Sequence, residues 1–273
     1  MRIALRLALL GLFLVPALLA GADNVQEALT GLESSDTSTY QKAAEFLLKH
    51  PQEARVPVRA LLQDYSKQPL TRFRAAKLLG DLGDRDAAEN MKAALSSGHE
   101  TNAAVRVEMI RSLVKVGRKD LIVDYFNSGL EKSPSVNAAM ALALQGSTDE
   151  GSKAMLGRLL SSNDDERVTK AAVFAITKIY KPALGGAQHT ASSKSSALSK
   201  ASSDARKLAA PPPPPPNHPP DDKLGSRKVK LDPTPADKAI FAALKAKGEG
   251  KDGEIGKQAQ ALLRELSEAY KQP

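Results

Sequence analysis

One sequence pattern recurs along more than half of this chain and limits what it can fold into. Recognisable copies occupy residues 74–83 (RAAKLLGDLG), 106–117 (RVEMIRSLVKVG), 137–146 (NAAMALALQG) and 167–180 (RVTKAAVFAITKIY), after a more divergent copy at 40–50 (YQKAAEFLLKH). The ends of successive copies lie 33, 34, 29 and 34 residues apart. A period of this length is typical of solenoids, in which each unit buries its apolar side only against its neighbours. Solenoids expose long surfaces to partners, so the pattern indicates a binding protein more than an enzyme.

Each copy predicts a pair of helices. In the copies that end at Gly83 and Gly117, apolar residues recur three apart and form one helical stripe, namely Phe73, Ala76, Leu79 and Leu82, then Val107, Ile110, Leu113 and Val116. The glycine that follows suits a helix end with a left-handed residue. The second helices are expected to begin near a proline or an acidic residue, over residues 57–65, 86–95, 120–130 and 149–160. Few aromatic residues and abundant Ala and Leu also favour helices.

The repeats resemble a known family. The stretch LLGDLGD at 78–84, and Val105-Arg106 before an apolar helix that ends in glycine, are similar to HEAT repeats, and most similar to bacterial HEAT-like repeats of the phycobilisome-lyase type. The resemblance extends from residue 36 to about residue 180. It implies an all-α, right-handed α-solenoid of about five helix pairs, whose concave face, lined by the second helices, holds a protein partner. Helix position on that face selects Arg59, Gln63, Lys92, Asp124, Asn127, Lys153 and Arg158 as candidate partner-binding residues. Lyase chemistry is not implied, because no chromophore-handling cluster carries over.

Residues 1–22 read as a signal peptide. Arg2 and Arg6 give a positive start, an apolar run follows, and Ala20-Gly21-Ala22 offers small residues for cleavage. The alternative is an uncleaved membrane anchor. The chain contains no cysteine and no Asn-x-Ser/Thr acceptor site, which agrees with a bacterial periplasmic location.

The domain organisation after residue 180 changes with composition. Residues 181–234 hold a Ser/Ala/Lys tract and six consecutive prolines at 211–216, a composition that predicts a disordered insertion or linker. Helical pattern resumes over 235–273, where residues 236–248 resemble residues 87–98. We therefore expect 235–248 to be the delayed second helix of the fifth repeat, completing the 23–180 repeat domain, with a closing helix at 254–270. The alternative is a tail that carries an independent helical hairpin.

The basic surplus of the chain lies outside the repeats. Residues 23–180 hold 21 basic and 21 acidic residues, whereas residues 181–235 hold nine basic and four acidic residues. This distribution argues against a nucleic-acid groove along the solenoid. The prolines form either a spacer or a polyproline ligand, and the lysines and arginines around them favour weak contact of residues 181–234 with an anionic envelope surface.

Catalytic and metal-binding motifs are not found in the sequence. His50, His99, His189 and His218 have no histidine or cysteine at metal-ligand spacing, and no phosphate-binding, hydrolase or dinucleotide fingerprint occurs. We expect no cofactor, no metal and no enzymatic activity. Arg72, Arg74, Arg106 and Arg167 recur at the starts of first helices. They form either a row that engages carboxylates or phosphates of a partner, or an internal ladder that pairs with Asp81, Asp84 and the acidic caps of adjacent turns.

The function that these observations favour is a non-catalytic protein-binding scaffold or adaptor, exported to the cell envelope. One alternative is a lyase-like enzyme or enzyme subunit. Another is an envelope-associating protein that acts through its basic, proline-rich segment.

Overall fold

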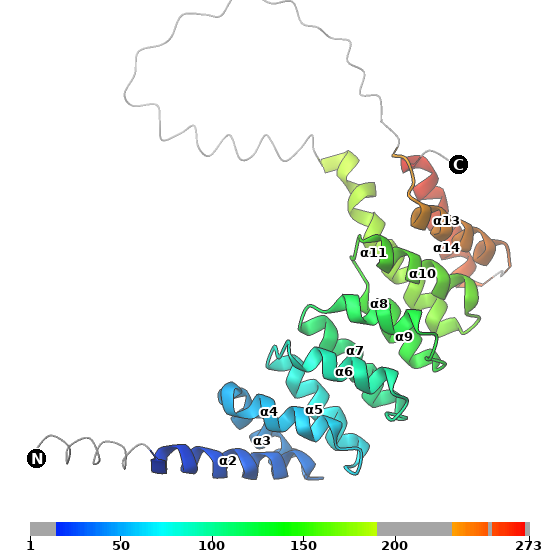
Figure 1. Ribbon diagram of the computed structural model, residues 1–273. Coiled ribbons are helices and arrows are strands. Elements are labelled where there is room, and N and C mark those ends of the chain that lie inside the picture. The colour runs from blue at the N-terminus through cyan, green and yellow to red at the C-terminus, as the bar shows by residue number, and fades with distance from the viewer. Residues whose placement is uncertain (1–14, 190–230, 251–252, 271–273) are drawn as a thin grey trace, which may run out of the picture. The chain divides into compact units, whose positions relative to one another are not determined.

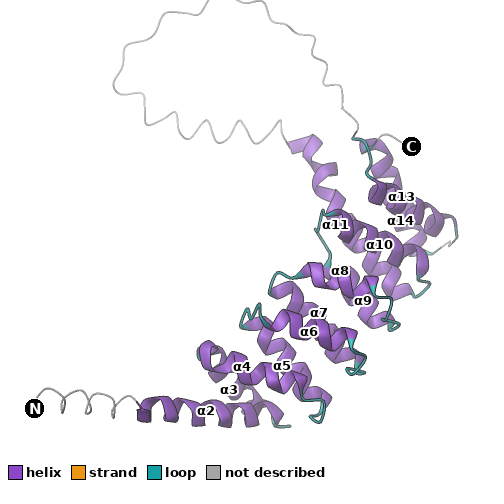
Figure 2. Ribbon diagram, in the orientation of Figure 1, coloured by secondary structure: helices purple, strands orange, loops and turns teal. Residues whose placement is uncertain are grey.

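The computed structural model describes residues 15–189, 231–250 and 253–270, and within them the regular structure is helical (Figures 1 and 2). The helices are α2 (Val15–Glu33), α3 (Thr37–Lys49), α4 (Pro51–Gln63), α5 (Pro69–Asp81), α6 (Ala87–Ser96), α7 (Ala103–Lys115), α8 (Lys119–Asn127), α9 (Pro134–Ala143), α10 (Glu150–Ser162), α11 (Glu166–His189), α13 (Pro235–Glu249) and α14 (Glu254–Ala269). One isolated bridge joins Leu231 to Tyr270. The prediction of an all-helical chain is confirmed for this part of the sequence.

The chain divides into two compact units. The first contains α2 to α9 and the beginning of α11, from residues 1–144 and 163–172. The second contains α10, the rest of α11, α13 and α14, from residues 145–162 and 173–273. In the first unit helices pack mainly on helices that are close in the sequence, as in an α-solenoid. Within the first unit α5 packs on α7 and α7 packs on α9, so first helices of successive pairs lie next to one another.

Glycine ends several of these helices as the pattern predicted. Gly83, Gly117 and Gly146 have φ angles of 60°, 77° and 72°. After Gly83 and Gly117 the next amide donates back across the turn, from Asp84 N to Leu79 O at 3.0 Å and from Arg118 N to Leu113 O at 2.8 Å. These are Schellman ends, which only a residue without a Cβ adopts at little cost.

The core is wider than the single predicted stripe. Ala76, Leu79, Ile110 and Leu113 are fully buried, but Phe73 and Val107 are partly exposed. Other residues of the same helices are buried in addition, including Ala75, Leu78, Val105 and Met109. The reason is that α5 and α7 are each covered on more than one side, because α5 lies against both α4 and α7.

One expected helix start is wrong, and the structure adds helix on both sides of the predicted repeats. The first helix pair is preceded by α2, which packs on α3 through Val25, Ala28, Leu29 and Leu32. Helix α4 begins at Pro51, where a proline suits the first turn, and it includes Pro57. Helix α11 continues past Tyr180 to His189, so the segment from 181 begins as helix. Residues 190–230, which hold the prolines, and residues 1–14 of the expected signal peptide lie outside the described residues.

The second unit joins segments on both sides of residues 190–230. Helix α13 packs closely on α10 and also on α14. The Asp237 carboxylate of α13 accepts a hydrogen bond from the Tyr180 hydroxyl of α11 and pairs with Lys153 of α10 at 3.0 Å. Asp237 also accepts from the Thr234 amide and so completes a capping box at the start of α13.

Helices α5 and α7 lie in close contact at Gly80. A Cβ at this position would lie 2.6 Å from Ser112 Oγ and 2.8 Å from Ser112 Cβ. We expect Gly80→Ala to lower the free energy of unfolding by about 1–3 kcal/mol, because the two helices must move apart. Urea denaturation followed by circular dichroism measures this. Ser112→Gly removes both of these Ser112 atoms, so in that background Gly80→Ala should lower the free energy of unfolding by less. An equal decrease in both backgrounds would contradict the close-approach explanation.

Candidate functional site

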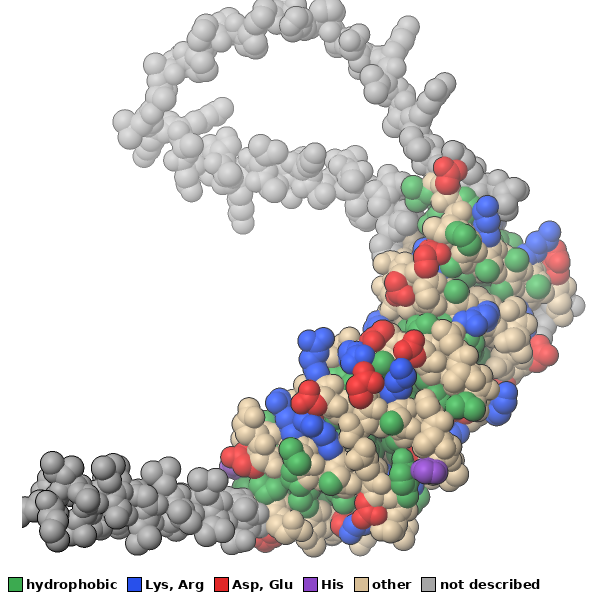
Figure 3. Space-filling model, viewed as in Figure 1, with side chains coloured by type: hydrophobic (Ala, Val, Ile, Leu, Met, Phe, Trp, Pro, Cys, Tyr) green, Lys and Arg blue, Asp and Glu red, His purple; other side chains and the backbone are tan. Residues whose placement is uncertain are grey.

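The candidate site is the exposed side of the second helices α4, α6 and α8 in the first unit, which we call the second-helix face. The structure places five of the seven predicted residues on these helices, namely Arg59, Gln63, Lys92, Asp124 and Asn127. The other two, Lys153 and Arg158, belong to α10 in the second unit. Figure 3 shows Lys and Arg side chains interspersed with Asp and Glu side chains on one face of the first unit.

Ion pairs link the second helices α4 and α6 to the helix pair that follows each of them. The Arg59 guanidinium of α4 donates to both carboxylate oxygens of Asp84, at 2.6 and 3.0 Å, and to Asp86 at 3.2 Å. Asp84 is only 2% exposed, so its charge is compensated by the bidentate pair. The hydrogen bonds that Arg59 donates to Asp84 are the main cause that raises the pKa of Arg59. Arg59 therefore fixes the loop before α6 against α4.

The same arrangement continues from α6 to α8. Lys92 Nζ lies 3.0 Å from Asp124 Oδ2. Arg118, at the start of α8, donates to Glu89 of α6 and to Asp120, both at 2.9 Å. These side chains remain partly exposed, since Asp124 is 55% and Glu89 is 61% exposed. The second-helix face therefore presents paired charges whose positions are set by neighbouring repeats.

The other predicted residues differ in their surroundings. Gln63 and Asn127 lie exposed at the ends of α4 and α8, and Arg158 is exposed on α10. Lys153 is buried instead: it is 9% exposed, and its ammonium lies 3.0 Å from Asp237 and 5.9 Å from the centre of the Tyr180 ring. This lysine holds α10, α11 and α13 together, so it is not a surface residue for a partner.

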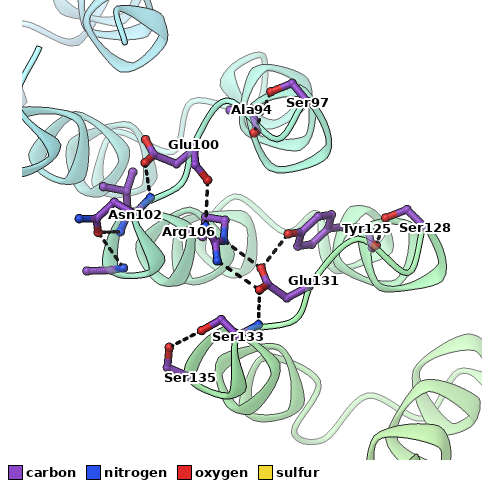
Figure 4. Close-up of polar contacts among 12 residues, drawn as sticks. Ala94, Ser97, Glu100, Asn102, Arg106, Tyr125, Ser128, Glu131, Ser133 and Ser135 are labelled. Atoms are coloured by element: carbon purple, nitrogen blue, oxygen red, sulfur yellow. Dashed lines mark hydrogen bonds and ion pairs between the residues drawn. The ribbon is translucent and has the colours of Figure 1, made fainter. Parts of the chain in front are cut away.

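Two of the four arginines at the starts of the first helices, Arg72 and Arg106, form an internal ladder, and their partners are not Asp81 or Asp84. The Arg72 guanidinium binds the Glu100 carboxylate at 2.7 and 3.1 Å, and this glutamate side chain is fully buried. Arg106 binds Glu131 in the same way at 2.9 and 3.2 Å (Figure 4). In each case an arginine of one repeat neutralises a glutamate in the loop before the next first helix.

Each of these glutamates also organises its own loop. Glu100 Oε1 accepts from the Asn102 amide at 2.9 Å, and Glu131 Oε1 accepts from the Ser133 amide at 2.6 Å. Asn102 and Ser133 are the N-cap residues of α7 and α9. The Tyr125 hydroxyl of α8 donates to the second oxygen of Glu131 at 2.7 Å (Figure 4). One carboxylate thus connects α7, α8 and the beginning of α9.

The ladder follows helix position rather than residue type. The fourth residue of α5, α7, α9 and α11 is Arg72, Arg106, Asn137 and Thr169 respectively. Arg74 and Arg167 are out of this register. Arg74 donates to the carbonyl oxygens of Leu32 and Ser34 and packs on Tyr40, whereas Arg167 pairs with Asp165 at the surface. The sequence analysis did not select Glu100 and Glu131, although a sequence signal for them exists. Each stands two residues before an N-cap residue and six residues before the fourth residue of the next first helix.

The pKa values in this network follow from its geometry. Burial pushes the pKa of Glu131 upward, but the Ser133 amide, the Arg106 guanidinium and the Tyr125 hydroxyl outweigh it, so the pKa lies below its ordinary value of 4.5. Burial, the hydrogen bond to Glu131 and its negative charge raise the pKa of Tyr125. At neutral pH Glu131 therefore stays ionised and Tyr125 stays protonated, as the hydrogen bond from the Tyr125 hydroxyl to the Glu131 carboxylate requires.

Comparisons with known proteins add no family. No protein-family model matches the sequence, and no curated protein matches it.

Among the described residues, no group of three or more histidine, cysteine, aspartate or glutamate side chains is placed to hold a metal ion. In the same part of the chain no helix is both long and apolar enough to cross a membrane.

The Arg72–Glu100 pair yields a stability prediction. Glu100→Gln removes the negative charge and leaves a buried guanidinium without its counter-ion, so we expect the free energy of unfolding to fall by about 3 kcal/mol. Urea denaturation provides the measurement. The control is Glu45→Gln, which breaks the exposed Glu45–Lys49 pair of α3 and should leave the denaturation midpoint unchanged. Equal midpoints for the two variants would show that the buried pair adds no stability.

The lowered pKa of Glu131 predicts a dependence of stability on pH. The folded protein binds this proton less tightly than the unfolded chain, so the contribution of Glu131 is present above the ordinary pKa of 4.5 and is lost as the pH falls through the lower folded value. Denaturation midpoints measured between about pH 6 and about pH 3 should decrease more in the native protein than in Glu131→Gln. A parallel decrease in both proteins would exclude Glu131 as a contributor.

Proposed function

We propose that this protein is a non-catalytic protein-binding scaffold or adaptor that presents the second-helix face to a partner. In this proposal α3–α4, α5–α6, α7–α8, α9–α10 and α11–α13 are five HEAT-like pairs of a right-handed α-solenoid, and α14 closes it. The protein is exported to the cell envelope after removal of residues 1–22. The residue patterns of the repeats and of the first 22 residues support this assignment.

The observation that carries the proposal is the set of ion pairs between successive second helices. Arg59 with Asp84, Glu89 with Arg118, and Lys92 with Asp124 connect α4 to the loop before α6, and α6 to α8. A charged side chain that is already held in one position loses less conformational entropy when a partner binds. Alternating positive and negative groups in fixed positions also give a complementary surface its orientation and selectivity.

The fold leaves this face available to a partner. The apolar residues of α6 and α8, such as Met91 and Ile122, are fully buried against neighbouring helices. The exposed sides of α6 and α8 therefore carry mainly polar groups, as expected for a surface that is soluble before it binds. We therefore expect hydrogen bonds and ion pairs to contribute much of the selectivity for the partner.

A charge exchange tests the role of the second-helix face. The double variant Lys92→Asp and Asp124→Lys keeps an ion pair between α6 and α8 but reverses its direction, so we expect unchanged thermal stability and at least about a tenfold loss in partner capture from envelope extract. Quantitative affinity capture with immobilised protein measures this. The matched control is Glu45→Lys with Lys49→Glu, which reverses an exposed pair on α3 and should retain capture.

A second arm separates the repeats from the proline-rich segment. Replacement of residues 190–230 by a short Gly/Ser linker should leave capture intact if the partner binds the second-helix face. Loss of the partner from a folded, shortened protein would assign the function to the basic, proline-rich segment instead. Capture that is the same for the native protein and the Lys92/Asp124 exchange would also overturn the proposal.

A further inference from the structure

The second unit contains a groove between its two last helices. The groove lies between α13 and α14 and has a volume of about 680 Å³. Its lining combines Phe241, Ala242, Leu263 and Tyr270 with the charged or polar Lys238, Lys245, Glu249, Gln260, Arg264 and Ser267. Nothing in the scaffold role of the second-helix face requires this groove.

Each of the two helices has a second stripe of residues that is not used in the core. Helix α13 buries Ala236, Ile240, Ala243 and Leu244, and α14 buries Ile255, Ala259, Leu262 and Leu266. The groove is lined by different positions, which recur at helical spacing: 238, 241, 242, 245 and 249 on α13, and 260, 263, 264 and 267 on α14. Two helical stripes that converge on one groove provide the surface on which a third helix packs.

The two helices are held antiparallel along the groove. At one end the rings of Phe241 and Tyr270 lie 5.5 Å apart and nearly perpendicular. At the other end the Gln260 amide donates to the Gly248 carbonyl oxygen at 2.8 Å, where a glycine allows close approach. Because both ends are fixed by side-chain contacts, the groove is formed before any partner arrives.

The floor of the groove includes one tyrosine whose hydroxyl can donate a hydrogen bond. Tyr270 lines the groove and is only 9% exposed, yet its hydroxyl makes no hydrogen bond to another described residue. Burial raises the pKa of Tyr270, so the hydroxyl stays protonated and able to donate.

The charge around the floor favours an acidic occupant. Lys238, Lys245 and Arg264 are exposed at the groove, against a single acidic residue, Glu249. Glu249 lies 4.0 Å from Lys245 and compensates that lysine in part. Lys238 and Arg264, one on each helix, form no ion pair with any residue that the structure describes. Both sides of the groove thus carry an uncompensated positive charge.

We propose that the groove between α13 and α14 binds an amphipathic helix of a protein partner, with an apolar stripe flanked by carboxylates. The apolar stripe covers Phe241 and Leu263, and the carboxylates pair with Lys238 on one side and Arg264 on the other. This inference goes beyond the scaffold function proposed for the second-helix face, because it uses residues of the second unit alone.

The test uses the full chain and two fluorescein-labelled helical peptides with the same Leu stripe at i, i+3, i+4 and i+7. One peptide has Glu at the flanking positions and the other has Lys. Fluorescence anisotropy should show that the Glu-flanked peptide binds at least about tenfold more tightly than the Lys-flanked peptide. The double variant Lys238→Glu and Arg264→Glu should reverse this preference. Lys257→Glu, an exposed change on α14 outside the groove, is the matched control and should bind as the native protein does.

Three results would overturn the proposal: no binding of the Glu-flanked peptide, equal binding of both peptides, or a preference that the Lys238/Arg264 variant leaves unchanged. Flotation with phosphatidylglycerol vesicles tests the competing occupant, a lipid surface. Vesicle binding that the Lys238/Arg264 variant loses, without peptide binding, would reassign the groove to the membrane. The Lys92/Asp124 exchange should leave peptide affinity unchanged, so failure of this proposal and failure of the scaffold proposal are distinguishable.

Discussion

The buried ion pairs between one repeat and the next are the constraint on which the first unit depends. Glu100 and Glu131 lie in loops that a solenoid must place against the preceding repeat, and their charges would be costly there without Arg72 and Arg106. Each pair is bidentate, so it fixes orientation as well as distance. Because each glutamate also accepts the amide of an N-cap residue, the same contact positions the start of the following helix.

The first unit thus contains two kinds of ion pair, buried and exposed. The pairs at the starts of the first helices are buried and connect repeats through their interior. The pairs of the second helices, such as Lys92 with Asp124, connect repeats at the surface, where water and salt weaken them. The interior pairs therefore specify how repeats stack, whereas the surface pairs are available for recognition. The scaffold proposal depends on this division of roles.

The second unit also depends on a buried carboxylate, but there it joins helices that are far apart in the sequence. Its helices come from segments before and after residues 190–230, so the chain connection alone does little to hold them together. Asp237 supplies the missing constraint, since its carboxylate joins Lys153 of α10, Tyr180 of α11 and the cap of α13. Burial and the hydrogen bond to Asp237 raise the pKa of Tyr180, which keeps the hydroxyl a donor. The side of α13 turned to α14 then remains to form the groove.

The sequence by itself determined the helical class, the period of the repeats and the glycine ends, because apolar spacing and the backbone freedom of glycine are local properties. It also indicated that residues 235–248 share the pattern of a second helix. Only the tertiary structure decided which polar residues pair. Position along α5, α7, α9 and α11, not the identity of the residue, selects Arg72, Arg106, Asn137 and Thr169 for the interior. The prediction that Lys153 is an exposed partner-binding residue was wrong because its burial depends on tertiary contacts. Its partner Asp237 is distant in the sequence and reaches α10 only in the folded chain.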